Sequence, residues 1–192
     1  MQGISLIVGL GNPGPEYAET RHNAGFRFLD ALLSGSNVAL RRESRFSGDV
    51  ARFGIGGQEL WLLAPQTFMN KSGESVAKFA NYYKIAPAEI LVAYDEIDLP
   101  VGAVRLKVGG GTAGHNGLTD VVEKLASPDC ARLRIGVGHP GSAAQVVSYV
   151  LKRPPAGELQ LIDEAIARAI VQLPDLVRGE YSRVMNALHA QK

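Results

Sequence analysis

Histidine is the residue type in this chain best suited to acid–base chemistry, because its side chain gains and loses a proton near neutral pH. The sequence holds four of them, His22, His115, His139 and His189. They form no H-E-x-x-H pattern, and the single cysteine, Cys130, cannot make a Cys-x-x-Cys site, so no metal is expected. No serine lies in G-x-S-x-G, and no helix-start signal lies near Cys130 to activate its thiol. Water is therefore the expected attacking group.

A water nucleophile needs a general base, and His22 is the favoured histidine. It lies between Arg21 and Asn23 and a short distance after the turn that carries Asn12, so polar groups surround it near the expected ends of strands. Surface and packing roles are commoner for histidine than catalytic ones. The residues alone therefore leave His22 as one candidate among the four histidines.

Asp95 is the carboxylate best placed to assist such a base. It follows the apolar run of residues 90–94, and open α/β sheets bind their ligands at the carboxyl ends of strands. A carboxylate there can hold an imidazole in one tautomer and stabilise its protonated form. Asp95, Glu96 and Asp98 could also be a solvated acidic loop, which on the residues alone is the commoner arrangement.

Glycine-rich turns raise the question of nucleotide binding. Gly9, Gly11 and Gly14 satisfy G-x-G-x-x-G after a predicted strand. A dinucleotide site also needs a second strand ending in an acidic residue about 20 positions later, whereas Asp30 lies in a predicted helix. The run at residues 109–114 lacks the Gly-Lys-Ser/Thr ending of a P-loop, although its backbone amides could bind a phosphate or carbonyl oxygen. A dinucleotide-dependent oxidoreductase is thus disfavoured, and NAD binding would test it.

The elements that must position these residues alternate between strands and helices. Apolar runs predict strands at residues 4–10, 48–53, 59–64, 90–94, 104–108 and 133–137. Helical spacing predicts helices within residues 17–33, up to about Tyr83, and over residues 114–125, 159–173 and 181–188. Asn70 or Ser72 should cap the second helix, and Pro174 should end or break the fourth. The pattern predicts one α/β domain over residues 1–192.

The composition is that of a globular protein, with 46% hydrophobic and 20% charged residues. No apolar run reaches the about 18 residues of a membrane span, and residues 1–4 lack the basic segment of a signal peptide. The single cysteine fits a reducing cytoplasm. The net charge is +1, but lysine and arginine fall in local groups that permit a basic patch, although scattered solvated charges are commoner.

Motifs rich in glycine and polar residues follow one another along nearly the whole chain. They are residues 8–14 (VGLGNPG) with Tyr17 and residues 20–25 (TRHNAG), residues 65–70 (PQTFMN) with Ser72 and Gly73, residues 95–98 (DEID) with Gly102, residues 109–111 (GGG) and residues 114–118 (GHNGL), and residues 132–141 (RLRIGVGHPG). In order and spacing they resemble the bacterial peptidyl-tRNA hydrolase family. The chain after Gly141 is similar only loosely, and Ala64 stands where a lysine commonly precedes the proline.

The resemblance implies a fold and an activity. The fold is a mixed, twisted β-sheet enclosed by α-helices. The activity is hydrolysis of the ester bond between a peptide, or an N-blocked aminoacyl group, and the 3′ end of tRNA, which recycles peptidyl-tRNA released during translation. Peptidyl-tRNA is the implied partner, with no cofactor, no metal, no membrane and no obligate protein partner. The implied protein is cytoplasmic and monomeric.

The resemblance also implies roles for particular residues. His22 would activate water, Asp95 would orient His22, and Asn12 would bind the first amide of the peptide. Asn70 and Asn116 would fix the substrate and the developing oxyanion. The remaining expected substrate or tRNA contacts are Tyr17, Phe68, Met69 and Asn23 in the motifs, and Arg105, Lys107 and Arg134 as phosphate contacts.

A protein of this fold that binds RNA without catalysis would share several of these motifs. The joint presence of His22, Asp95 and the asparagines favours the enzyme, because a pure binding protein would not need the set. Turnover of an N-blocked aminoacyl-tRNA separates the two hypotheses.

Overall fold

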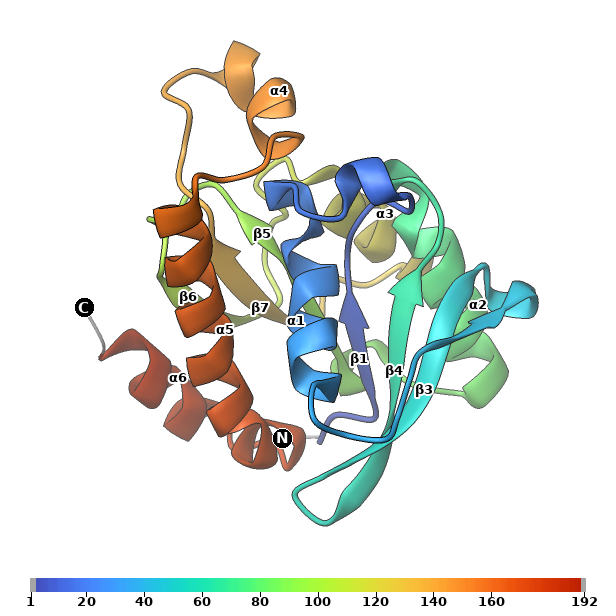
Figure 1. The fold of residues 1–192 in the computed structure, drawn as a ribbon. Helices are drawn as coiled ribbons and strands as arrows, with labels where there is room; N and C mark the ends of the chain where they lie inside the picture. Colours follow the sequence, from blue (N-terminus) through green and yellow to red (C-terminus); the bar gives the residue numbers. More distant parts are fainter. Residues whose placement is uncertain (1–2, 191–192) are drawn as a thin grey trace.

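Seven strands form one mixed, twisted sheet in the computed structural model, which describes residues 3–190 (Figure 1). The strands are β1 (Leu6–Gly9), β2 (Arg41–Glu43), β3 (Gly48–Ile55), β4 (Gln58–Pro65), β5 (Ile90–Glu96), β6 (Val104–Val108) and β7 (Ala131–Gly136). Their order across the sheet is β2-β3-β4-β1-β5-β7-β6. The predicted α/β class is confirmed. The predicted domain also includes residues 1–2 and 191–192, which lie outside the described residues.

The central strands β4, β1, β5 and β7 run parallel, so their carboxyl ends meet at one edge of the sheet. The outer strands pair antiparallel: β2 with β3, β3 with β4, and β6 with β7. Ligands of open α/β sheets bind at the carboxyl ends of strands. The turns after β1 and β4 and the last residues of β5 therefore reach the same place.

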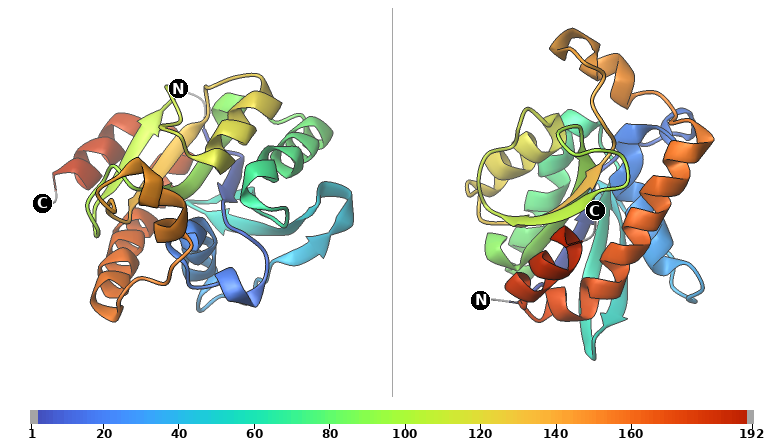
Figure 2. Two further views of the ribbon diagram at one scale, coloured as in Figure 1. Left: turned by 90° about the horizontal axis from the view of Figure 1, so that it is seen from above. Right: turned by 90° about the vertical axis from the view of Figure 1, so that its left-hand side faces the viewer.

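Helices cover both faces of the sheet (Figures 1 and 2). Helices α1 and α5 cover one face, with α6 beside β6, and α2 and α3 cover the other. Strand β1 serves both layers, because successive side chains of a strand point to opposite faces. Ile7 packs in the core beneath α1 and α5, whereas Leu6 and Val8 pack in the core beneath α2 and α3. The helix bounds are α1 Ala24–Leu33, α2 Ser72–Tyr83, α3 Asn116–Leu125, α5 Ala156–Val177 and α6 Tyr181–His189.

One short helix, α4 (Val146–Val150), stands apart from both layers, beyond the carboxyl ends of the central strands (Figures 1 and 2). It was not predicted from the sequence, and neither was the short edge strand β2. Both are too short for a periodic pattern to mark them. The other predicted strands and helices are present, with ends shifted by a few residues except for β6, which has the predicted bounds.

Pro174 does not end its helix, so that prediction is wrong. Helix α5 continues through Pro174 to Val177. A proline in a helix interior costs about 3 kcal/mol because it lacks a hydrogen-bond donor. Here the last turn is held by its surroundings: Leu173 and Leu176 are buried, and the carbonyl of Val177 accepts a hydrogen bond from the amide of Ile4 at 2.9 Å.

The predicted cap of α2 is also wrong. Lys71 is the residue before the helix, and its side chain makes no capping hydrogen bond. Ser72 is the first residue of the helix, and Asn70 lies in the preceding 3-10 turn, η4 (Met69–Lys71). The carboxylate of Asp120 on α3 instead accepts the amide of Gly73 at 2.8 Å, so a neighbouring helix satisfies a donor that a cap residue would otherwise satisfy.

Within residues 3–190, none of the helices combines the length and the apolar composition that crossing a membrane requires.

Candidate active site

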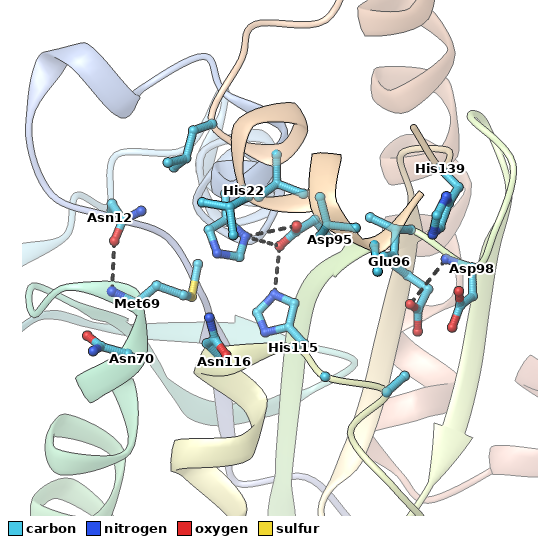
Figure 3. Close-up of a pocket in the computed structure, with 18 of the residues that line it drawn as sticks. Asn12, His22, Met69, Asn70, Asp95, Glu96, Asp98, His115, Asn116 and His139 are labelled. Carbon is cyan, nitrogen blue, oxygen red and sulfur yellow. Dashed lines mark hydrogen bonds and ion pairs between the residues drawn. The ribbon is translucent and has the colours of Figure 1, made fainter. Parts of the chain in front are cut away.

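A cleft of about 670 Å³ opens at the carboxyl ends of the central strands, and helix α4 forms one of its walls (Figure 3). Seven of the predicted site residues line it: Asn12, His22, Phe68, Met69, Asn70, Asp95 and Asn116. The other five do not line it: Tyr17, Asn23, Arg105, Lys107 and Arg134. Residues that are far apart in the sequence are therefore brought together here by the parallel strands.

Asp95 is the centre of the polar network in this cleft. It lies at the end of β5 and is only 2% exposed. The Nδ1 atom of His22 lies 2.9 Å and 3.0 Å from its two carboxylate oxygens. The Nε2 atom of His115 lies 2.8 Å from one of them, so two rings bind one carboxylate (Figure 3).

The hydrogen bonds around these rings fix where their protons are. Nδ1 of His115 accepts the amide of Leu118 at 3.1 Å, so its Nε2 carries the proton that is donated to Asp95. Nδ1 of His22 also donates to Asp95, because an ionised carboxylate only accepts. In neutral His22 this leaves a lone pair on Nε2, the atom a general base would use.

The network shifts the pKa values of both charged partners. Burial lowers the pKa of His22, but the charge and hydrogen bond of Asp95 outweigh it, so the pKa lies above its ordinary value. Burial would raise the pKa of Asp95, but electrostatic attraction to the His115 and His22 rings and the hydrogen bonds that these rings donate bring it well below its ordinary range. Asp95 therefore stays ionised, and His22 is a stronger base than a free imidazole.

His22 is held in place by a tight approach between β1 and the start of α1. It lies in a 3-10 turn, η2 (Arg21–Asn23), which leads directly into α1. At Gly25, a side chain would collide with the backbone of Leu10 and with the carbonyl of Ala93 on β5. Glycine at this position lets the helix start lie against the ends of both strands, which brings His22 to Asp95.

Asn12 is fixed from two sides. Its backbone amide and carbonyl are both bound by the side chain of Asn23, at 2.9 Å and 3.0 Å. Its own Oδ1 accepts the amide of Met69 at 2.7 Å. No hydrogen bond from Nδ2 of Asn12 to another described residue is present, so that donor is available at the cleft. Asn23 thus supports Asn12 instead of lining the cleft itself.

The remaining predicted residues lie around the opening of the cleft. Asn70 and Asn116 are exposed, and Asn116 is the first residue of α3 (Figure 3). The ring of Phe68 is 62% exposed at the rim, which is far more than a core phenylalanine. Tyr17 is half-buried in the turn η1 (Pro15–Tyr17), outside the lining of the cleft.

The predicted basic contacts lie on β6 and β7 and differ among themselves. Arg105 and Arg134 are directly opposite each other in the sheet. Arg134 binds Glu96, a residue of the cleft, at 2.9 Å. Arg105 donates at 2.9 Å to its neighbour's carbonyl and at 3.4 Å to that of Leu188 on α6. Lys107 is exposed, so the three cations are not equally free to bind phosphate.

His115 was not predicted to belong to the site. Its position could have indicated it, because His115 directly precedes the predicted residue Asn116 and is the cap residue of α3. The apolar wall of the cleft was also missed, because it lies in the loosely similar region after Gly141. That wall consists of Val146, Val147, Val150 and Leu151.

His22, Asp95 and His115 are also a group that could hold a metal ion, since one ligand atom of each lies within 4.8 Å of the others. The nitrogens that face Asp95 are occupied as donors, and the other nitrogen of His115 accepts from Leu118. Hydrogen bonds therefore account for the orientation of both rings without an ion. A site without metal stays a prediction.

A histidine with a carboxylate behind it and an open cleft in front is typical of enzymes that use a general base. The fold is that of an α/β protein whose polar cleft lies at the carboxyl ends of its central strands. The family model for peptidyl-tRNA hydrolase matches residues 6–192. The chain belongs to the peptidyl-tRNA hydrolase family, and it is a hydrolase.

Individual relatives agree with this assignment over the whole chain. A peptidyl-tRNA hydrolase of Yersinia enterocolitica is 51% identical over 193 residues, covering 100% of this chain and 98% of its own. One of Neisseria gonorrhoeae is 48% identical over 188 residues, covering 98% of each chain. The crystal structure of peptidyl-tRNA hydrolase from Acinetobacter baumannii has a TM-score of 0.96 at 48% identity, covering 100% of this chain and 97% of that chain.

Proposed function

We propose that this protein hydrolyses the ester bond between a peptide, or an N-blocked aminoacyl group, and the 3′ end of tRNA. The observation that carries the proposal is the orientation of His22. Its Nδ1 donates to the buried carboxylate of Asp95, which leaves Nε2 to act as a base at the cleft. Membership of the peptidyl-tRNA hydrolase family supports the choice of substrate.

In the proposed reaction, Nε2 of His22 takes a proton from a water molecule as the water oxygen attacks the ester carbonyl carbon. Asp95 stabilises the imidazolium ion that forms. The tetrahedral intermediate then collapses, the bond to the 3′ oxygen of the ribose breaks, and that oxygen takes the proton back from His22. The products are a free carboxylic acid and tRNA with its hydroxyl restored. An ester has a better leaving group than an amide, so a positioned water, one base and a few hydrogen-bond donors should suffice.

The asparagines supply those donors in the proposal. Nδ2 of Asn12 would bind the first amide of the peptide, which distinguishes a blocked from a free aminoacyl group. Asn70 and Asn116 would hold the substrate and the oxyanion. Asn116 lies in the first turn of α3, where the positive end of the helix dipole adds to the stabilisation of developing negative charge. Asparagine donates without placing a negative charge near RNA phosphate.

The remaining contacts concern the tRNA. The exposed ring of Phe68 at the rim is suited to stacking on an unpaired terminal base, and Tyr17 is proposed for the same role. Lys107, Arg134 and Arg105 would contact phosphates beyond the cleft, with Lys107 the least engaged by the protein itself. The proposal includes a cytoplasmic monomer that recycles tRNA without metal or cofactor.

Purified protein incubated with N-acetyl-aminoacyl-tRNA should release N-acetyl amino acid, whereas free aminoacyl-tRNA should be cleaved much more slowly. In water enriched in ¹⁸O, the label should enter the carboxylate of the released acid and not the ribose hydroxyl, because water attacks the carbonyl carbon. Absence of turnover would refute the proposed substrate, and label in the ribose would refute the proposed attack.

A further inference from the structure

The residue directly before His22 is a buried arginine whose side chain contacts Tyr149 of helix α4 and does not line the cleft. Arg21 is only 7% exposed. Its guanidinium carbon lies 3.8 Å from the centre of the Tyr149 ring, and its Nη1 donates to the carbonyl of Tyr149 at 3.0 Å. Stacking and a hydrogen bond to the same residue fix both the distance and the direction of the contact.

The backbone of Arg21 strengthens this connection. Its amide donates at 3.1 Å to the carbonyl of Lys152, just after α4. Nη2 lies 3.7 Å from the carboxylate of Glu158 at the start of α5. The hydroxyl of Tyr149 donates at 2.6 Å to the carbonyl of Val137, after β7. Arg21 and Tyr149 thus link the turn that carries His22, the helix α4 and the end of the sheet.

Helix α4 needs such a connection because it lies outside both helical layers (Figures 1 and 2). Of its five residues only Val150 is buried. Val147 is 66% exposed, although it lines the cleft together with Val146 and Leu151. A helix with so little buried surface is held weakly by packing, so individual contacts decide where it lies.

If the contact served stability alone, a buried arginine would be a poor choice, because burying its charge costs free energy. Nε of Arg21 is buried without a hydrogen-bond partner among the described residues, and its carboxylate partner Glu158 is 3.7 Å away and 35% exposed. A buried charge that is incompletely paired often contributes less stability than an apolar side chain of similar size. The arrangement favours a role in positioning over one in stability alone.

We propose that Arg21 is a positioning residue. It holds helix α4 in place as the apolar wall of the cleft, at a fixed position relative to His22. This inference deepens the proposed function and rests on it where substrate binding is concerned. Arg21 would act through Tyr149 and α4 on the binding of the apolar part of the substrate. It would not act on the chemistry, because Asp95, which also binds His115, holds the ring of His22, and Arg21 makes no hydrogen bond to that ring.

The test compares Arg21→Met with Arg153→Met. Arg153 pairs with Glu19 at 2.9 Å and joins the same two segments, but its side chain is 66% exposed. Both variants remove one positive charge and keep a long side chain, and only the first removes the contact with Tyr149. Steady-state kinetics with N-acetyl-aminoacyl-tRNA and amide hydrogen exchange over residues 146–151 are measured on both.

Arg21→Met should raise KM roughly tenfold, the effect of losing one or two charge-assisted hydrogen bonds, and should change kcat by no more than about twofold. The amides of residues 146–151 should exchange faster, and the pH profile of kcat should not move. Arg153→Met should behave as wild type. Arg21→Lys should restore only part of the wild-type KM, because lysine lacks the planar guanidinium that can stack on a ring and donate hydrogen bonds at the same time.

Tyr149→Leu removes the stacked ring and the hydroxyl bond to Val137 but keeps the backbone carbonyl that Arg21 binds, and it serves if Arg21→Met does not fold. Its effects combined with Arg21→Lys should be less than additive, because both changes act on one contact. Unchanged exchange of α4, a fall in kcat at unchanged KM, or an equal effect of Arg153→Met would each overturn the proposal. If the wild type itself does not turn over, the proposed substrate fails, and the exchange measurement alone decides whether Arg21 holds α4.

Discussion

The charged groups of the cleft around His22 and the basic residues of β6 and β7 differ in burial and in the number of their partners. In the cleft, Asp95 is 2% exposed and accepts hydrogen bonds from two histidines. On β6 and β7, Lys107 is exposed, and the side chain of Arg134 is 24% exposed with one carboxylate partner. Buried partners interact strongly, and removing one leaves the other without compensation. Exposed charges interact weakly and are screened by salt.

This difference teaches which part of the proposed function depends on geometry and which on charge alone. A base must lie within hydrogen-bond distance of its proton, so the cleft tolerates little displacement. Phosphate contacts act over a wider range, and each contributes a separate, salt-dependent share of the binding free energy. Substitutions in the two regions should therefore produce different kinds of effect as well as different sizes.

The largest effect is expected for His22→Ala. Removal of the general base should lower kcat on the order of 100- to 10,000-fold. Binding of tRNA should stay nearly intact, because the proposed phosphate contacts are on β6 and β7. Initial rates and tRNA affinity measured side by side check this. His189→Ala, on α6 outside the cleft, is the matched control and should keep its activity. A near-normal rate in His22→Ala would remove the assignment of the base.

Asp95→Asn should lower kcat/KM on the order of 100-fold without unfolding the protein. In the wild type, burial lowers the pKa of His22, but Asp95 raises it more, so activity should fall as pH drops through a value above the ordinary histidine pKa. Loss of the Asp95 charge lowers the pKa of His22 and moves that acid limb to lower pH. A pH–rate profile with an unmoved limb would contradict the role of Asp95. Asp129→Asn, in an exposed loop, is the control.

Asn12→Asp separates the two functions of one side chain. An aspartate keeps an oxygen that accepts the amide of Met69 but loses the Nδ2 donor proposed for the peptide amide. KM for N-acetyl-aminoacyl-tRNA should rise at least about tenfold, because one hydrogen bond is lost and a negative charge is added near the RNA. Asn12→Ala should in addition lower the melting temperature, because it leaves the Met69 amide unsatisfied. Equal KM values for wild type and Asn12→Asp would place the amide contact elsewhere.

The smallest change in turnover is expected for the double variant Lys107→Gln and Arg134→Gln, in which the glutamine at position 134 keeps a donor for the buried carboxylate of Glu96. Each lost phosphate contact should reduce the slope of log affinity against log salt by about 1, with a modest loss of affinity at low salt. Titration of tRNA at several salt concentrations measures the slope. Arg41→Gln with Arg52→Gln, on the opposite edge of the sheet, removes the same charge as a control. An unaltered slope would mean that Lys107 and Arg134 do not contact phosphate, and that β6 and β7 do not bind the tRNA through these residues.

Much of the fold could be predicted because local patterns agree with the tertiary structure. The runs that became β3, β4, β5 and β6 were each predicted within a few residues, since buried strands need continuous or alternating apolar side chains. The rejection of a dinucleotide site also depended on a local feature, and Asp30 is helical, as expected. Failures occurred where a neighbour overrides the local preference. Pro174 stays helical because of burial around it, and Asp120 supplies the hydrogen bond that a cap of α2 would make.

The site follows the same rule. His22, Asp95 and Asn12 could be nominated from motifs, because each lies where a predicted strand or turn ends. His115 was not nominated, although it binds Asp95 as closely as His22 does. Nothing in the sequence says which of four histidines shares a carboxylate, since that depends on how α3 lies against β5. The contact of Arg21 with α4 was equally hidden, because it joins positions 128 residues apart.

The sequence by itself determined the types of chemical group available to this protein and the elements that carry them: histidines, amides and a carboxylate at the ends of apolar strands. Only the tertiary structure decided that two imidazoles donate to Asp95, that Asn23 holds the backbone of Asn12 without lining the cleft, and that a weakly packed helix forms a wall of the cleft. The physical reason is that strand and helix formation depend on local spacing. The pKa of a base and the shape of a cleft depend instead on atoms that the chain brings together from distant positions.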